Sequence, residues 1–301
     1  MNNKVVVIGC GNVGMSYCYA LLNQKTYVNE LVLIDINKTV LEGEVMDLNH
    51  CLAYSPSKIN IRIGEYSDCK NAKIVVIAAG ANQNVGETRM DLIHKNSKIF
   101  KSIVDNVMNS GFDGIFLVAT NPLDIMTYLT YKYSNLSPNK VLGSGTTLDT
   151  ARLKYIISEK VGISPKDINA YVLGEHGDSE FVAWSNANIA LKRISSYLTK
   201  QEMEQIEEDV RNSAYEIIKK KGATYYGIGM CLVRITEAIL GDENIILSVS
   251  SYDFENDIYI STPAIVNKYG VKGKIFVPFN DIETKKIINS INVIKSAINN
   301  L

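Results

Sequence analysis

Residues 5–14 read VVVIGCGNVG, and this stretch decides the fold class. Residues 5–8 form a continuous β-branched run, as expected for a strand that is buried on both faces of a parallel sheet. Gly9, Gly11 and Gly14 follow with the spacing that permits a tight turn, a close backbone approach to a pyrophosphate and close packing of the next helix. The N-terminus of that helix offers N–H groups and a positive dipole end to phosphates. The stretch therefore predicts a dinucleotide-binding loop, with Asn12 and Val13 among its cofactor contacts.

An acidic residue follows this loop at the distance that a dinucleotide site requires. The second apolar run, residues 31–34, ends at Asp35, about 20 residues beyond the glycines. A carboxylate at this position can accept hydrogen bonds from the adenosine ribose hydroxyls, and it would repel a 2′-phosphate. The simpler alternative is a glycine turn with a solvated acid beside it. The pattern favours NAD over NADP as the cofactor.

The first half of the chain alternates strand-like and helix-like segments. The expected strands are residues 5–8, 31–34, 59–63, 74–77 and 115–118. The expected helices are residues 13–22, a stretch that ends at residue 48, and residues 88–108. Repeated β-α-β units imply an α/β fold, a Rossmann-type doubly wound parallel sheet with helices on both faces.

The regular alternation of expected strands and helices ends at about residue 144. Helices are expected over residues 147–161 and from a capping box at Thr199 and Glu202 through residue 219. Residues 245–249, 258–260 and 274–277 are expected as strands of a mixed or antiparallel sheet. A C-terminal helix carries five isoleucines on one predicted face: Ile287, Ile288, Ile291, Ile294 and Ile298. We therefore expect a Rossmann NAD-binding domain in residues 1–144 and an α+β substrate-binding domain in residues 145–301.

The composition is that of an ordinary globular protein. Of 301 residues, 46% are hydrophobic and 21% charged, which supplies a sizeable core and argues against disorder. The 31 basic and 32 acidic residues leave a net charge of -1, so nothing favours nucleic acid or an anionic membrane as a partner. The apolar runs are far shorter than the roughly 20 residues of a membrane span. The N-terminus shows no signal-peptide pattern.

The cysteines are widely spaced and form no CxxC pair. They are Cys10, Cys18, Cys51, Cys69 and Cys231. An odd number of separated thiols is typical of reduced cytosolic cysteines that pack as small hydrophobic residues. The spacing does not favour a structural zinc site. We expect a cytoplasmic protein without a bound metal.

Histidine is rare in this chain, which has His50, His94 and His176. His176 lies in LGEHGDS, residues 173–179, a polar and glycine-flanked segment in which a core histidine is unusual. His50 and His94 lie on helical segments, where a structural role is the simpler interpretation. His176 is therefore the candidate for proton transfer.

Asp149 and Arg152 lie three residues apart on an expected helix and therefore share a face. The plain interpretation is a surface ion pair worth a few tenths of a kcal/mol. The alternative gives Asp149 the task of orienting a histidine, and Arg152 that of binding a carboxylate through two parallel hydrogen bonds. Only six of the 31 basic residues are arginines. In a chain this rich in lysine, an arginine is expected mainly where its planar guanidinium group is needed, and this favours the second interpretation of Arg152.

A second arginine lies in a polar loop between an apolar strand and the long helix. The loop reads GANQNVGETR, residues 80–89, and ends at Arg89, with Gly80 and Gly86 as flexible joints. Loops beyond the carboxyl ends of parallel strands bind ligands in doubly wound sheets. We expect this loop to close over a ligand, although an ordinary surface loop would have a similar composition.

Taken together, these motifs resemble the L-lactate/malate dehydrogenase family, most nearly its bacterial L-lactate dehydrogenases. The resemblance covers essentially the whole chain. It rests on VVVIGCGNVG, VMDLNH (45–50), AAGANQNVGETR (78–89), VATNPLD (118–124), GSGTTLDTAR (143–152) and LGEHGDS (173–179).

The resemblance implies a role for each matching position. NADH would pass a hydride to a 2-oxo acid while protonated His176 gives a proton to its carbonyl oxygen. Asp149 would orient His176, Arg152 would bind the substrate carboxylate, and Arg89 would polarise the carbonyl. Asn121 would lie near the nicotinamide and substrate, and Gly80 would contact the cofactor.

Two positions bear on substrate choice within this family. Its malate enzymes usually carry an arginine where this chain has Gln83, so a second substrate carboxylate would lack a partner here. Thr224 is similar to the residue of the lactate enzymes that limits the room for the substrate side chain. Both favour pyruvate and L-lactate. The alternatives are an L-2-hydroxyisocaproate-type or a malate dehydrogenase, because a neutral pocket also accepts an apolar side chain.

The resemblance also bears on assembly and regulation. It implies a homotetramer. Many bacterial members are activated by fructose 1,6-bisphosphate through an arginine and a histidine, whose matching positions here are Lys154 and Asn169. Since neither offers a bidentate fork or an imidazolium, we expect weak or absent activation. A non-catalytic NAD-binding subunit is the alternative from another class, and the presence of His176 and its partners argues against it.

Overall fold

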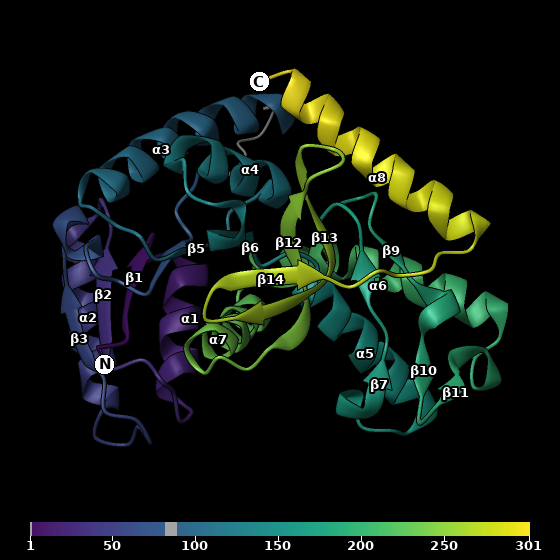
Figure 1. The fold of residues 1–301 in the computed structure, drawn as a ribbon. Coiled ribbons are helices and arrows are strands. Elements are labelled where there is room, and N and C mark those ends of the chain that lie inside the picture. Colours follow the sequence, from purple (N-terminus) through teal and green to yellow (C-terminus); the bar gives the residue numbers. More distant parts are fainter. Residues whose placement is uncertain (1, 82–88) are drawn as a thin grey trace.

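The computed structural model describes residues 2–81 and 89–301, and its first half alternates strands and helices (Figure 1). The strands are β1 (Lys4–Ile8), β2 (Glu30–Ile34), β3 (Asn60–Ile63), β4 (Ile74–Ile77), β5 (Ile115–Val118) and β6 (Val141–Gly143). The helices are α1 (Asn12–Leu22), α2 (Lys38–Cys51), α3 (Arg89–Asn109) and α4 (Leu123–Ser134).

The second half contains helices, long antiparallel strands and small sheets. The helices are α5 (Thr147–Val161), α6 (Lys200–Lys221), α7 (Tyr226–Leu240) and α8 (Asp281–Asn299). The long strands are β12 (Ile245–Asp253), β13 (Ile258–Asn267) and β14 (Gly270–Lys274). The short strands are β7 (Ile168–Asn169), β8 (Val172–Leu173), β9 (Phe181–Val182), β10 (Asn188–Ile189) and β11 (Lys192–Arg193).

Within the described residues, nine strands form one sheet in the order β14-β13-β12-β6-β5-β4-β1-β2-β3. Strands β1 to β6 run parallel, with Val5 opposite both Leu31 of β2 and Ile74 of β4. Strands β12, β13 and β14 extend this sheet in the antiparallel sense from β6. Since the strand order reverses at β1, the carboxyl ends of β1 and β4 mark the place where doubly wound sheets bind ligands. The predicted fold class is confirmed.

Alternate side chains of the central strands point to opposite faces and bury two cores. Val5 and Val7 pack with α1, α2 and α7, whereas Val6 and Ile8 pack with α3, α4 and α8. Figure 1 shows these two groups of helices on opposite sides of the sheet. A third cluster joins α5 to α6 and includes Leu153 and Ile206. The sheet is thus buried on both faces, as the uninterrupted apolar runs predicted.

Two details of the predicted elements are wrong. The last strand covers residues 270–274 rather than 274–277, and Phe276 beyond it is 88% exposed. Four of the five isoleucines on α8 are buried or partly buried, but Ile288 is 51% exposed. At 100° per residue Ile288 lies at the edge of the apolar stripe, about 90° from its centre.

Among the helices that the structure describes, none combines the length and apolar character needed to cross a bilayer.

Candidate active site

The glycine loop between β1 and α1 is a tight turn at the carboxyl edge of the sheet. Gly9 has a φ of +96°, and a Cβ at this position would lie 2.3 Å from the backbone nitrogen of Ala79. A Cβ at Gly14 would lie 2.1 Å from the carbonyl oxygen of Gly9. Both positions therefore require glycine, and the turn holds the start of α1 closely against β1.

The loop fits the pyrophosphate of NAD. A Cβ at Gly11 would meet no described atom within 4 Å, so open space lies over the backbone where phosphates approach in this motif. Gly11 is the N-cap of α1, and among the described side chains none caps this helix or places an acid in its first turn. Asn12 and Val13 open the helix, where N–H groups lack intrahelical acceptors. An anion is favoured at such a helix end.

Asp35 is held beside the glycine loop at the end of β2. Its Oδ2 accepts a hydrogen bond from the backbone N–H of Cys10 at 2.7 Å, and its Oδ1 accepts from the N–H of Asn37 at 2.9 Å. The side chain remains partly exposed. Because each carboxylate oxygen has a further lone pair, Asp35 can also accept the hydroxyl protons of a ribose.

A buried asparagine joins the loops that follow β4 and β5. Asn96 on α3 is fully buried, its Oδ1 accepts from the N–H of Ala81 at 2.8 Å, and its Nδ2 donates to the carbonyl oxygen of Asn121 at 3.1 Å. A Cβ at Gly80 would lie 2.5 Å from Cγ2 of Thr120. Gly80 and the exposed Asn121 therefore lie on neighbouring loops at the same edge of the sheet.

The structure brings His176 to Asp149, 27 residues away along the chain. Nδ1 of His176 lies 2.8 Å from Oδ2 of Asp149, and Nη1 of Arg152 donates to Oδ1 of Asp149 at 2.7 Å. Asp149 and Arg152 share a face of α5, but they are not a surface pair, since their side chains are only 2% and 12% exposed. Because Asp149 engages Nδ1, Nε2 of His176 is the nitrogen that can exchange a proton with a ligand.

Charge and burial together set the protonation of this group. Burial alone would lower the pKa of His176, but the charge and hydrogen bond of Asp149, aided by Glu180 and Asp124, raise it to about 9. Burial opposes ionisation of Asp149, yet His176 and Arg152 hold the pKa of Asp149 below its ordinary value. At neutral pH the pair is therefore an imidazolium beside a carboxylate, the form from which His176 can donate a proton.

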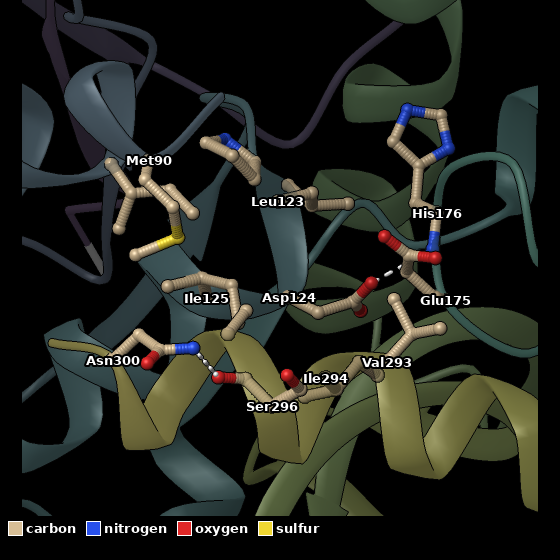
Figure 2. A pocket seen from close by; sticks show the side chains of 13 residues that line it. Met90, Leu123, Asp124, Ile125, Glu175, His176, Val293, Ile294, Ser296 and Asn300 are labelled. Atoms are coloured by element: carbon tan, nitrogen blue, oxygen red, sulfur yellow. Dashed lines mark hydrogen bonds between the residues drawn. The ribbon is translucent and has the colours of Figure 1, made fainter. Parts of the chain in front are cut away.

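A buried carboxylate on α4 fixes the loop that carries His176 (Figure 2). Oδ2 of Asp124 accepts the backbone N–H of His176 at 2.7 Å, and Oδ1 accepts the hydroxyl of Ser250 at 2.5 Å. Burial raises the pKa of Asp124 to about 6, although both hydrogen bonds oppose the rise. Ser179 donates to Oε2 of Glu175 within the loop at 2.5 Å. The backbone of His176 is thereby placed relative to α4 and β12.

A cavity of about 290 Å³ lies beside this loop, between α3, α4 and α8. Figure 2 shows Met90, Leu123, Ile125 and Ile294 around it, with Glu175 and His176 at one end. Its lining side chains are mostly apolar, and Asp124, Glu175 and His176 supply the ionisable groups among them.

The two positions matched to sugar-bisphosphate activation make contacts with other residues. Nζ of Lys154 lies 5.7 Å from the centre of the Tyr171 ring, and burial lowers the pKa of Lys154. Nδ2 of Asn169 donates to Oδ1 of Asn188 at 3.3 Å. Asn169, Tyr171 and Asn188 line a second cavity of about 290 Å³.

Three of the predicted site residues are not joined to His176 by the described contacts. Gln83 lies outside the described residues, and so does the side chain of Arg89, whose backbone begins α3. Thr224 lies in the segment before α7, whose first turn packs Gly227 against Leu148 of α5. The role of every predicted site residue stays a prediction.

The structure also identifies polar residues that the sequence did not indicate. Asn96, Asp124 and Glu180 are all buried polar side chains at this edge of the sheet. Their burial is what marks these polar side chains as candidates for a function. Burial cannot be read from the sequence without the fold. Asp149, His176 and Glu180 bring one ligating atom each within 4.8 Å of one another. Nδ1 of His176 and Oδ2 of Asp149 are hydrogen-bonded to each other at 2.8 Å within this group.

Known proteins match the whole chain. A family model for the NAD-binding domain of lactate/malate dehydrogenases matches residues 3–143, and one for their alpha/beta C-terminal domain matches residues 146–301. The L-lactate dehydrogenase of Bacillus pumilus is 52% identical over an alignment of 306 residues, covering 98% of this chain and 97% of that protein. A lactate dehydrogenase from a Medee basin deep-sea metagenome has a TM-score of 0.96 at 51% identity, over 99% of this chain and 98% of that one. The ligand-bound minor L-lactate dehydrogenase of Enterococcus mundtii has a TM-score of 0.97 at 42% identity, over 100% and 98%. The chain therefore belongs to the lactate/malate dehydrogenase family.

Proposed function

We propose that this chain is an NAD-dependent L-lactate dehydrogenase, which converts pyruvate, NADH and a proton into L-lactate and NAD⁺ and also runs in reverse. The observation that carries the proposal is the hydrogen-bonded array of Arg152 and His176 around the buried Asp149. A dinucleotide-binding loop lies in the same fold, and the similar proteins named above are lactate dehydrogenases.

The residues of the chain divide the reaction into separate tasks. NADH, when bound, supplies a hydride to the carbonyl carbon of pyruvate. His176 delivers the proton from Nε2 to the carbonyl oxygen, while Asp149 holds Nδ1–H and orients the ring. In the reverse direction neutral His176 takes the hydroxyl proton of lactate. General acid–base catalysis of this kind contributes roughly 10²–10⁴-fold.

Two arginines would bind and polarise the substrate. Arg152 gives one Nη to Asp149, and the remaining edge of its planar fork can receive the substrate carboxylate. We assign to Arg89 the polarisation of the carbonyl oxygen, which gains strength once water is excluded. Asn121 would then contact the nicotinamide and the substrate, with Gly80 beside the cofactor. For the cofactor we retain Gly9, Gly11, Asn12, Val13, Gly14 and Asp35 as contacts.

Pyruvate is the proposed 2-oxo acid because the pocket is expected to be neutral and small. Gln83 carries no charge to pair with a second carboxylate, and a buried unpaired carboxylate costs several kcal/mol. Thr224 would limit the room beside the carbonyl carbon. An apolar 2-oxo acid with a larger side chain is therefore the alternative substrate that a panel must include.

The test follows NADH oxidation at 340 nm with pyruvate, oxaloacetate and 2-oxoisocaproate in parallel at equal concentrations. We expect pyruvate to give the highest kcat/KM, by two decades or more over oxaloacetate. A preference for oxaloacetate would leave the hydride chemistry in place and refute the interpretation of Gln83 and Thr224. If no 2-oxo acid reacts while NADH still binds, the catalytic proposal is wrong.

We further propose a division into residues 1–144 and 145–301, a homotetrameric assembly, a cytoplasmic location and weak or absent activation by fructose 1,6-bisphosphate. The division is supported by the two family models, which meet between residues 143 and 146. Sedimentation at micromolar concentration tests the tetramer. A large drop in the half-saturating pyruvate concentration on adding the sugar bisphosphate would contradict the last point.

A further inference from the structure

We propose that Glu180 belongs to this site as an electrostatic partner of His176, and that its carboxyl group sets the upper pH limit at which His176 keeps its proton. The role of His176 in catalysis rests on the proposed function. The contact between the two side chains does not, and it can be tested in the protein without substrate.

Glu180 is held in place by its own loop. Its backbone N–H donates to the carbonyl oxygen of Gly177 at 3.1 Å, and its carbonyl oxygen accepts from Nη2 of Arg211 on α6 at 3.3 Å. The side chain is only 7% exposed, and Oε2 lies 4.0 Å from Nδ1 of His176. That nitrogen already donates to Asp149, so two carboxyl groups face the same side of the imidazole.

The charged neighbours of Glu180 come from every element around it. Asp149 and Arg152 face it from α5, Arg211 from α6, and His176 from its own loop. The charge of Asp124 on α4 also raises the pKa of His176. The buried thiol of Cys231 on α7 lies near Asp149 and Arg152. The carboxyl group of Glu180 is therefore enclosed by one acid and three basic groups. Its ionisation is opposed by burial and by Asp149, and the basic groups favour it.

The short distance between Glu180 and the imidazole gives the charge of Glu180 its effect. Burial and then the charge of Asp149 raise the pKa of Glu180 to about 8, below the value of about 9 for His176. At neutral pH Glu180 is uncharged. As the pH rises it becomes a carboxylate 4.0 Å from the imidazolium, and this charge retards the loss of the His176 proton. Screening as in bulk water sets a lower limit of about 0.7 pH unit for an opposite charge at this distance.

The effect has opposite consequences for the two directions of the reaction. Pyruvate reduction needs protonated His176, so the charge of Glu180 extends this activity to higher pH. Lactate oxidation needs neutral His176, so the same charge delays its onset by the same amount. A residue with a merely structural role would change the rate in both directions without moving either midpoint.

The first experiment titrates the histidine itself. The chain has only three histidines, so ¹³C-histidine NMR can follow His176 after assignment with His50→Gln and His94→Gln. In Glu180→Gln we expect the His176 midpoint to fall by about 0.7 pH unit or more. The matched control is Asp178→Asn, which removes an exposed acid of the same loop whose side chain bonds to Tyr215, and which should leave the midpoint in place. Equal midpoints in the wild type and Glu180→Gln would overturn the proposal.

The second experiment measures initial rates against pH in both directions. We expect Glu180→Gln to shift the alkaline fall of pyruvate reduction and the rise of lactate oxidation to lower pH by the same amount. Glu180→Asp keeps the charge and should lie between Glu180→Gln and the wild type. If Glu180→Gln does not fold, the wild type still decides, because a second step near pH 8 in the His176 resonance is required. A single step overturns the proposal, whereas absent turnover with two steps refutes only the lactate dehydrogenase function.

Discussion

Replacing Asp149 by asparagine removes the charge that keeps His176 protonated. Burial disfavours the imidazolium, and the charge and hydrogen bond of Asp149 raise the pKa of His176 to about 9 against that penalty. Relative to the ordinary value of 6.5, this rise corresponds to about 3 kcal/mol in favour of the charged ring. Without Asp149 the burial penalty remains and only Glu180 and Asp124 oppose it, so the pKa of His176 should fall toward its ordinary value of 6.5.

The loss at a given pH follows from this change. At pH 7 the protonated fraction of His176 is about 99% with a pKa near 9, and it would be about 24% if the pKa fell the whole way to 6.5. We therefore expect kcat/KM for pyruvate reduction to fall by up to about fourfold from protonation alone. An asparagine that presents its amide N–H₂ group to Nδ1 would also select the wrong tautomer and reduce the rate further.

The assay is the initial rate of NADH oxidation at 340 nm between pH 5 and 10, at pyruvate concentrations far below KM. The alkaline midpoint of Asp149→Asn should lie well below that of the wild type, by up to about 2.5 pH units. Glu159→Gln removes an exposed acid from the same helix and serves as the matched control. NADH binding and the melting temperature confirm that each variant is folded. An unchanged midpoint in a folded Asp149→Asn protein would refute the electrostatic reasoning.

Three further predictions address the remaining parts of the site. His176→Asn should bind NADH normally but lose roughly 10²–10⁴-fold in kcat, and near-normal turnover by stopped-flow would remove it from proton transfer. Arg152→Lys should raise KM for pyruvate more than it lowers kcat, because an ammonium lacks the bidentate fork; an unchanged KM would place Arg152 outside the binding site. Gly11→Ala should keep its melting temperature but weaken NADH binding in a fluorescence titration, since its Cβ points into open space. Gly9→Ala should instead lower the free energy of unfolding in urea by about 1–3 kcal/mol, because φ of Gly9 is positive and the new Cβ would meet Ala79. Equal stabilities of the Gly9 and Gly11 variants would contradict the assigned geometry.

Much of the fold was predictable because its signals are local. Uninterrupted apolar runs predicted β1, β4 and β5, and the glycine spacing predicted the turn before α1, since both depend on backbone sterics and strand burial. The capping box at Thr199 and Glu202 is present at the start of α6. Other elements carried no such signal. Nearly all of the first two turns of α4 is buried, so a helix there has no polar face to give a helical period.

By itself, the sequence determined the doubly wound class, the dinucleotide loop with Asp35, and the presence of His176, Asp149 and Arg152, because spacing along the chain constrains turns and helix faces. The tertiary structure decided which of these groups meet. It placed Nδ1 of His176 on Asp149 across 27 residues, and it buried Asp124 and Glu180 beside the same loop. Ionisation depends on distance and on the loss of water, and neither quantity exists along a sequence. The charge state of the catalytic group is therefore a property of the fold.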